Sequence, residues 1–320
     1  MFEGKEYVYR VYKEGSFSKA AKSLYISQPS LSAAVKREES RIGNPIFDRS
    51  TSPVSLTECG QKYVDCVERI LAVENEFSNY LTDLNGLQTG CLILGGSHLF
   101  SSYVLPPLIG AFSRRYPKVT VRLVEESSSA LEQLLLAGSV DLVADNSSFS
   151  EELFSRILLR TEELLLAVPS SFAVNRTAAA YRLPGEHIRH GAHLTDGIPC
   201  VPLALFKDEP FVFLKPENDT RQRQMALCRQ AGFTPRVVLE LDQQVTAYNL
   251  TDSGMGISFI SDTLVRSVPP HPNVTYYKLS GPLSQRRIWI YQKRGRYVSR
   301  AMEAFLDIAR AGRTAPEPSP

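Results

Sequence analysis

The 320-residue sequence lacks any hydrophobic run that approaches the roughly 18–20 residues needed to span a bilayer, and Leu164–Val168 is typical of its longest runs. The chain does not open with a basic stretch followed by an apolar one, so we expect no secretory signal. Its five cysteines are scattered and never form a CxxC pair, which argues against a disulfide framework or a structural zinc site. We therefore expect a cytoplasmic protein that does not enter a membrane.

Enzyme signatures are also missing. The sequence contains no Gly-x-Gly-x-x-Gly, no P-loop and no Gly-x-Ser-x-Gly motif. His187, His190 and His193 recur every three residues, but Pro184 and Gly191 make this segment a loop, and few acids accompany it. We expect solvated histidines here rather than a metal site. Because the sequence shows no nucleophile–base pair and no ligand set, we expect neither catalysis nor a bound cofactor.

The sequence has no large excess of either charge, because its net charge is only +2. The charge is nevertheless uneven: residues 10–49 hold eight Lys or Arg against four acids, and the remainder of the chain is slightly negative. A small basic segment attached to a slightly acidic body is typical of a DNA-reading head on a body that does not bind DNA. The alternative is a chance fluctuation of surface charge.

The first 60 residues predict three short helices and a two-stranded wing, at 6–13, 19–24, 27–43 and 44–56. Ser27 is a typical N-cap for the third helix, and Pro29 falls in its first turn, where a missing N–H is tolerated. Gly43 is a typical helix end. This spacing is that of a helix-turn-helix.

The exposed face of the third helix would present short polar and basic side chains. Gln bonds adenine through two atoms, Ser bonds either base type, and Lys or Arg bonds guanine or phosphate. Short polar side chains also let the helix enter the major groove. The alternative is an ordinary solvated helix surface. We expect bases to be read by Gln28, Ser30 and Ser32, phosphates to be held by Lys36, Arg37 and Arg49, and further DNA contacts from Ser18, Ser27 and Pro29.

A long helix is expected from Thr57 onward, since Thr57 is a typical N-cap and an acid follows in the first turn. Apolar residues recur in steps of three and four over about 28 residues, a rhythm typical of a coiled-coil seam. A helix that packs only on its own domain is the alternative, although such a helix is more often shorter. We expect a linker and dimerisation helix over 57–89, with a seam formed by Val67, Ile70, Phe77 and Leu81.

From Cys91 the pattern changes to strands that alternate with helices, which implies parallel sheets covered on both faces. Strands are expected at 91–94, 119–125, 141–144, 164–168, 211–214, 236–240, 257–260, 274–278 and 287–292. Helices are expected at about 101–115, 129–138, 220–231, 243–253 and 298–311. Residues 172–209 are expected to be irregular, and the proline-rich segment 313–320 is expected to be a disordered tail.

Several motifs together resemble the LysR-type transcriptional regulators. In the head these are Ser16–Ser32, Asn44–Arg49 and Leu56–Gly60. In the body they are Leu105-Pro106 with Phe112 and Tyr116-Pro117, Gly138–Leu142, Ala231–Pro235 and Gly254–Ile257. The motifs follow the family's order and spacing over nearly the whole chain. The resemblance implies a winged helix-turn-helix over 1–60, the linker helix, and a two-lobed α/β body over 90–312 that resembles periplasmic binding proteins and binds an effector.

One residue departs from the family pattern. Glu38 lies on the apolar stripe of the third helix, with Leu31, Val35 and Ile42, where the family usually has an apolar residue. A buried unpaired carboxylate would cost several kcal/mol. Either Glu38 pairs with a nearby base, or this end of the helix is partly exposed.

The resemblance also implies two chain crossings between the lobes, near 163 and 267, with lobe one at 91–163 and 268–312 and lobe two at 164–267. Ligands of open α/β sheets bind where strands end and helices begin. Such ends occur after the strands at 91–94, 119–125 and 211–214. Two helix N-termini and a lysine facing one cleft would favour an anion such as a carboxylate. We expect effector contacts from Ser97, His98, Ser127, Lys215, Asn218 and Thr220, with simple helix capping as the alternative.

The sequence therefore favours a DNA-binding transcriptional regulator, a dimer or tetramer, that senses a small anionic metabolite and binds double-stranded DNA at an imperfect inverted repeat. The alternative from another class is an α/β enzyme with an attached DNA-binding head. A regulator that senses a protein, or nothing, is a third possibility. The missing catalytic constellation argues against the enzyme.

Overall fold

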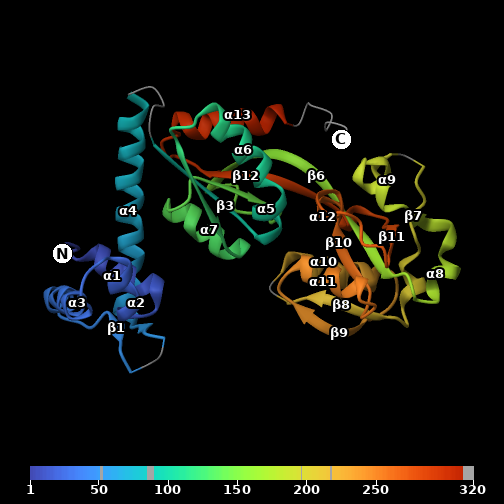
Figure 1. Ribbon diagram of the computed structural model, residues 1–320, viewed down its shortest axis with the longest axis horizontal. Coiled ribbons are helices and arrows are strands. Elements are labelled where there is room, and N and C mark those ends of the chain that lie inside the picture. The colour runs from blue at the N-terminus through green and yellow to red at the C-terminus, as the bar shows by residue number, and fades with distance from the viewer. Residues whose placement is uncertain (51–52, 85–89, 196, 217, 313–320) are drawn as a thin grey trace.

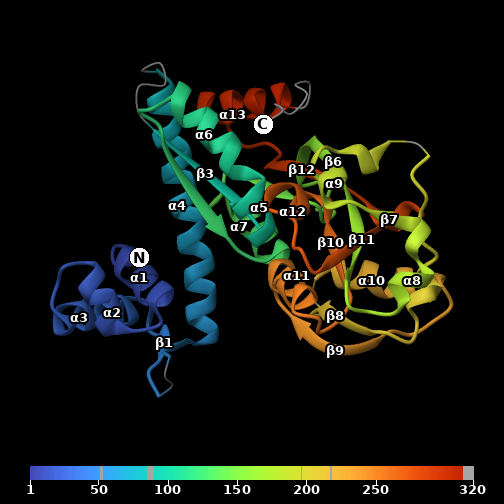
Figure 2. The same cartoon turned by 45° about the vertical axis from the view of Figure 1, so that its right-hand side comes forward.

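The computed structural model describes residues 1–50, 53–84, 90–195, 197–216 and 218–312. A small helical head lies at one end of a long helix, and the two-lobed α/β body lies beside and beyond that helix (Figure 1). Turning the molecule shows the same three parts, with the head set apart from the body's second lobe (Figure 2). None of the described helices combines the length and the apolar character needed to cross a membrane. The expected tail at 313–320 lies outside the described residues.

The head is the predicted winged helix-turn-helix. Ser16 and Ser27 cap the second and third helices, and Gly15 and Gly43, both in the left-handed conformation, end the first and third. Val8, Ala20, Leu31, Val35 and other apolar side chains form one core beneath the three helices. Its elements are α1 (Lys5–Glu14), α2 (Phe17–Ser23), α3 (Gln28–Ile42), β1 (Phe47–Asp48) and β2 (Ser55–Leu56).

Helix α4 (Glu58–Leu84) begins at Thr57, whose hydroxyl accepts a hydrogen bond from the Gly60 N–H at 2.9 Å. The helix packs on both neighbouring parts of the chain. Its first half contributes Tyr63 and Val67 to the head core, and Val67 is fully buried there. The expectation that Val67 lies in a seam between two chains is therefore wrong, because that side chain is not on the surface of a single chain.

The second half of α4 lies against the first lobe of the body. Gly138 approaches it so closely that a Cβ at this position would lie 2.9 Å from the Ala72 Cβ. Gly138 also has a positive φ of +80° as the C-cap of α7 (Ser128–Ala137), so two requirements select glycine here. Near the end of α4 the buried Asp83 accepts hydrogen bonds from the Tyr297 hydroxyl and the Arg300 N–H.

The first lobe is a mixed sheet rather than the purely parallel one expected. β3 pairs in parallel with β4 and β5, while β12 pairs antiparallel with β5 and β6. The expected helix at 101–115 is instead two helices that meet at Val104, and the second of them has prolines in its first turn. The elements are β3 (Cys91–Gly96), α5 (His98–Tyr103), α6 (Leu105–Arg115), β4 (Thr120–Glu125), α7, β5 (Leu142–Asp145), β12 (Gln285–Lys293) and α13 (Arg300–Ala311).

Strand β6 (Phe154–Pro169) is one continuous strand that passes between the lobes. Up to Glu163 it pairs with β12, and from Leu164 it pairs with β10 (Ser258–Ser261) and β11 (Val274–Lys278). The first crossing is therefore at residues 163–164, as expected. The second is not at 267, because β11 still belongs to lobe two, and the chain returns between β11 and β12.

The second lobe also contains a parallel pair, β8 (Pro210–Leu214) and β9 (Arg236–Leu241). The segment expected to be irregular, 172–209, contains short elements that cover this lobe: α8 (Val174–Thr177), β7 (Arg182–Leu183), α9 (Gly185–Arg189) and three 3-10 turns at Ala179–Tyr181, Ala192–Leu194 and Leu203–Phe206. The remaining elements are α10 (Asp219–Gln230), α11 (Gln244–Asp252), α12 (Asp262–Ser267) and a 3-10 turn at Pro282–Ser284.

His193 corrects another expectation. It is fully buried, and its Nε2 lies 3.0 Å from an oxygen of the buried Asp262. His187 and His190 are exposed as expected, although the segment is not the loop predicted from Pro184 and Gly191, because His187 lies in α9 and His190 caps its end. The three histidines therefore do not share one environment, and no group of metal-ligating side chains was found among the described residues.

Candidate functional site

The N-terminal half of α3 presents an exposed polar surface. Ser27, Gln28, Pro29 and Ser30 are all exposed, as are Lys36 and Arg37 further along the helix. The Ser27 hydroxyl accepts a hydrogen bond from the Ser30 N–H at 3.3 Å and lies 2.7 Å from the Ser30 hydroxyl. The first turn of the helix is thus held in place by its own cap. Ser18, on α2, is exposed as well.

The wing is tied to α3 through Glu39. This carboxylate accepts hydrogen bonds from the Ile46 and Phe47 N–H groups at 2.9 and 3.3 Å, and it forms an ion pair with Arg49 at 3.0 Å. Arg49 also donates to the Ser32 hydroxyl at 3.3 Å. Arg49 therefore holds the wing against α3, so the structure gives it a positioning role besides the phosphate contact expected from the sequence.

Sequence reasoning missed Tyr25, which lies in the turn between α2 and α3. Its side chain is 96% exposed, and its φ of 55° is in the left-handed region, which is uncommon for a residue other than glycine. The turn therefore leaves an aromatic ring exposed three residues before Gln28. A β-turn signal could have placed the residue, but not its exposure.

Glu38 is buried and fully paired. Its two oxygens accept hydrogen bonds from the Phe2 N–H at 2.6 Å, the Gly4 N–H at 3.2 Å and the Tyr63 hydroxyl at 2.9 Å. Arg41 lies 3.4 Å away. Burial alone would raise the pKa of this carboxyl, but these donors together hold its pKa below the usual value. Glu38, the residue that departs from the family pattern, thus links the N-terminal residues and α4 to α3 through hydrogen bonds.

Replacing Glu38 by Gln should therefore destabilise the head in a pH-dependent way. Because the folded-state pKa is depressed, the stabilisation is fully present above the unfolded pKa and is lost as pH falls through the folded pKa. At pH 7 we expect Glu38→Gln to cost about 1–3 kcal/mol, and the difference from wild type to shrink below about pH 4. Urea unfolding of the full chain, followed by circular dichroism, measures both. Glu3→Gln, at an exposed carboxylate that pairs with Arg41, is the control and should change little. A deficit that does not vary with pH would contradict the account.

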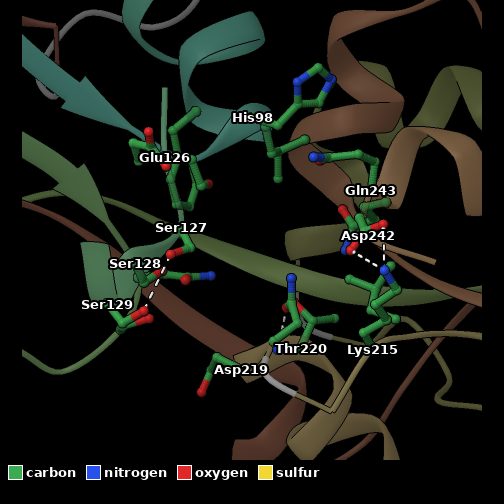
Figure 3. Close-up of a pocket in the computed structure, with 18 of the residues that line it drawn as sticks. His98, Glu126, Ser127, Ser128, Ser129, Lys215, Asp219, Thr220, Asp242 and Gln243 are labelled. Carbon is green, nitrogen blue, oxygen red and sulfur yellow. Dashed lines mark hydrogen bonds and ion pairs between the residues drawn. The ribbon is translucent and has the colours of Figure 1, made fainter. Parts of the chain in front are cut away.

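A cleft of about 980 Å³ lies between the two lobes of the body. All six residues expected from the sequence line it: Ser97, His98, Ser127, Lys215, Asn218 and Thr220. Figure 3 shows His98 and the 126–129 segment on one side, with Lys215, Asp219, Thr220 and Asp242 on the other. The structure thus brings together residues from both lobes, each of them next to the end of a strand.

Two of these residues also cap helices. The Ser127 hydroxyl accepts from the Ala130 N–H at 3.4 Å, and the Asn218 side chain accepts from the Thr220 N–H at 2.9 Å. The N-termini of α7 and α10 therefore open at the cleft, where their peptide dipoles favour negative charge. Ser127 and Asn218 therefore cap helices and also line the cleft, so the two interpretations of the sequence do not exclude each other.

The charges of the cleft could not be read from the sequence. Lys215 forms an ion pair with Asp242 at 2.9 Å, and His98 Nδ1 lies 2.8 Å from Glu125. Five carboxylates line the cleft against two permanent cations: Glu125, Glu126, Glu132, Asp219 and Asp242 against Lys215 and Arg286. These carboxylates come from the end of β4, from α7, from the start of α10 and from the segment after β9, so no single sequence motif brings the two groups together.

The exposed face of α4 carries a short apolar stripe. Phe77 and Leu81 are 61% and 45% exposed, and Val73 and Tyr80 lie beside them and are also exposed. The ring of Phe77 stacks on that of Tyr80 at 6.4 Å between centroids. Ile70 is half-buried on the same side of the helix. Four large apolar side chains on one helix face form an exposed apolar patch, beside which Tyr80 also packs edge-on against Tyr297.

Comparison with known proteins identifies the family. The family model for the bacterial regulatory helix-turn-helix of the lysR family matches residues 4–61, and that for the LysR substrate binding domain matches residues 85–313. The chain belongs to the LysR family. LysR-type proteins are DNA-binding transcriptional regulators with an effector-binding domain, so the chain is a regulator and not an enzyme.

Individual LysR-type relatives agree with this assignment. An uncharacterized HTH-type transcriptional regulator YcgK of Bacillus subtilis is 30% identical over 95% of this chain and 92% of its own length. A probable RuBisCO transcriptional regulator of Gracilaria tenuistipitata is 28% identical over 92% of this chain and 91% of its own. The crystal structure of CbnR, a LysR family regulator, has a TM-score of 0.69 at 19% identity, covering 98% of this chain and all of its own. CbnR in complex with its target DNA gives a TM-score of 0.68 at 20% identity, covering 97% of this chain and 99% of its own.

Proposed function

We propose that this LysR-type regulator binds an imperfect inverted repeat as a dimer, or as a pair of dimers, and that a small metabolite in the interlobe cleft changes its DNA binding. The observation that carries the proposal is the cleft itself: six polar residues from two lobes line one space at the ends of strands. A ligand there can bias the regulator only if it binds one lobe arrangement better than another.

The chemistry of the cleft narrows the ligand. A negative group would be held by the N–H groups at the starts of α7 and α10, since Lys215 is already paired with Asp242. The many carboxylates of the lining accept hydrogen bonds and oppose a second negative group. We therefore propose a small metabolite that carries a negative group together with hydrogen-bond donors such as hydroxyl or ammonium groups.

Ser97→Trp tests this proposal. Ser97 lines the cleft and makes no side-chain capping bond, so a larger side chain there fills the cleft without uncapping α5. The effector is first found by thermal-shift screening of a metabolite library on the full chain. We expect Ser97→Trp to weaken its binding at least tenfold in calorimetry, about 1.4 kcal/mol, and to make operator binding insensitive to it.

The matched control is Ser113→Trp, a serine of similar exposure on α6 that does not line the cleft. It should bind the effector as the wild type does. Both variants should bind operator DNA with wild-type affinity when no effector is present, because the head is untouched. Wild-type effector affinity in Ser97→Trp would remove the cleft residues from the proposal.

A further inference from the structure

Glu162 and Arg286 meet at the point where the chain passes between the lobes. Glu162 is the last-but-one residue of β6 before the crossing, Arg286 is the second residue of β12 after the return, and the two are direct partners in the sheet. Their side chains form an ion pair, with 2.6 Å between Glu162 Oε1 and Arg286 Nη2. Both side chains are at least 98% buried, so this pair is removed from water at the place where β6 leaves lobe one and where β12 begins after the return.

The carboxylate of Glu162 has further partners in both lobes. From lobe one, the Asn146 amide donates to Oε1 at 3.3 Å. From lobe two, the Thr263 hydroxyl donates to Oε2 at 2.8 Å, and the Ser261 hydroxyl also donates to Oε2. One buried carboxylate is therefore bonded to Asn146 of lobe one, to Arg286 at the start of β12, and to Ser261 and Thr263 of lobe two.

Arg286 extends this arrangement to the cleft. Its Nη1 donates to the Thr220 hydroxyl at 2.7 Å, and Thr220 lies in the first turn of α10, on the lobe-two wall. Arg286, Thr220 and Asn146 all line the cleft. The Nε of Arg286 is buried and has no hydrogen-bond partner among the described residues. Any movement of Thr220 in the cleft wall would therefore alter a hydrogen bond of Arg286, the charged residue beside the interlobe crossing.

A buried ion pair strongly constrains the relative positions of the elements that carry its two residues. Removing two charges from water is costly, and the cost is repaid only while the pair and its surrounding hydrogen bonds keep good geometry. If the lobes rotated against each other, the distance between Asn146 and Thr220 would change, and the bonds that Glu162 and Arg286 make to both lobes could not all keep their geometry. The arrangement in the structure is therefore the one in which both charges are satisfied.

We infer that Glu162 and Arg286 are positioning residues that fix the angle between the lobes and link it to the Thr220 side of the cleft. The inference deepens the proposed ligand switch, since a ligand that contacts Thr220 would change the bonds of Arg286. The angle between the lobes is, however, a property of the free chain, so it can be measured without a ligand and without DNA.

The test measures the distance between the lobes in the full-length protein. Spin-labelled unnatural amino acids replace Lys118 in lobe one and Arg229 in lobe two, both of which are exposed. Pulsed electron resonance then gives the distance distribution. Labelled chains are mixed with an excess of unlabelled chains, so that only the distance within one chain is measured, and we expect one narrow distribution for the otherwise wild-type chain. Thr220→Val, which loses the acceptor for Arg286, should shift the distance distribution or make it about twice as wide. Thr220→Ser, which keeps the hydroxyl, should leave the distribution unchanged.

Glu162→Gln and Glu163→Gln form a second matched pair. Both residues are buried neighbours on β6 and lose the same charge, but Glu163 contacts Lys278 and Gln285 rather than Arg286, the residue that bonds Thr220 at the cleft. Glu162→Gln should broaden the distribution, and Glu163→Gln should leave it narrow. If Glu162→Gln fails to fold, the two Thr220 variants decide alone. Equal distributions in Thr220→Val and Thr220→Ser, or equal broadening in the two glutamate variants, would overturn the inference.

A failure of the proposed effector function gives a different result. If no metabolite acts through the cleft, the Ser97→Trp experiment fails while the distance distributions still differ among the Thr220 variants. If the ion pair serves only to stabilise the fold, the distributions stay narrow and only the melting temperature falls. The two experiments therefore separate the ligand site from the device that fixes the angle.

Discussion

Replacing Phe77 and Leu81 of α4 together by Asp should convert the regulator from a dimer to a monomer. The two side chains are one helical turn apart on the exposed apolar stripe, so a facing helix would cover them both. In a two-fold dimer each chain meets the same patch on its partner, so the double variant would bury four carboxylates of like charge. Each uncompensated buried charge costs several kcal/mol, which is enough to abolish association at micromolar concentrations.

Sedimentation velocity of the full chain measures this directly. Gln61→Asp adds a negative charge to α4 at an exposed position near its start, away from the stripe, and this variant should remain dimeric. DNA binding should follow assembly, because a dimer places two α3 helices on half-sites one helical turn, or a multiple of it, apart. The monomeric variant should lose about 10²-fold or more in affinity for an inverted repeat, while its affinity for a single half-site stays nearly unchanged. A stable dimer of the Phe77/Leu81 variant would remove the stripe from the account.

Local sequence signals were sufficient for the head. Ser27, Pro29 and Gly43 each act through the backbone within a turn or two of their own position, so their effects can be read without knowing the fold. The cleft residues were predictable for a similar reason. Strand ends and helix starts are local features, and the rule that ligands lie there holds wherever helices cover an open sheet.

The sequence could not show what depends on contacts between distant segments. The 3.5-residue spacing of apolar residues in α4 does not distinguish a side chain that packs in the core of the same chain from one at a seam between two chains. Val67 is of the first kind, and Phe77 is expected to be of the second. The partners of Glu38 come from the N-terminus and from α4. The second crossing was placed too early because β11 has the pattern of any buried strand, and only its pairing with β6 assigns it to lobe two.

The central claim is that the exposed face of α3 reads bases, and Gln28→Ala tests it. Gln28 is exposed at the start of the helix, where a recognition helix meets base edges. Losing a bidentate contact to one base costs about 1–3 kcal/mol, a factor of roughly 5–150 in affinity for the correct sequence. Binding to scrambled DNA should not change, because phosphate contacts supply that affinity.

Lys36→Ala is the matched comparison. Lys36 is exposed on the same helix, and the described residues offer it no ion-pair partner, whereas Arg49 is already paired with Glu39. Its loss should weaken binding to operator and scrambled duplexes alike and reduce the salt dependence by about one unit. The decisive measurement is therefore a titration of both variants against an operator found by in vitro selection and against its scrambled form, at several salt concentrations. The account predicts that Gln28→Ala loses affinity only for the operator, and equal losses on both DNAs for Gln28→Ala would contradict it.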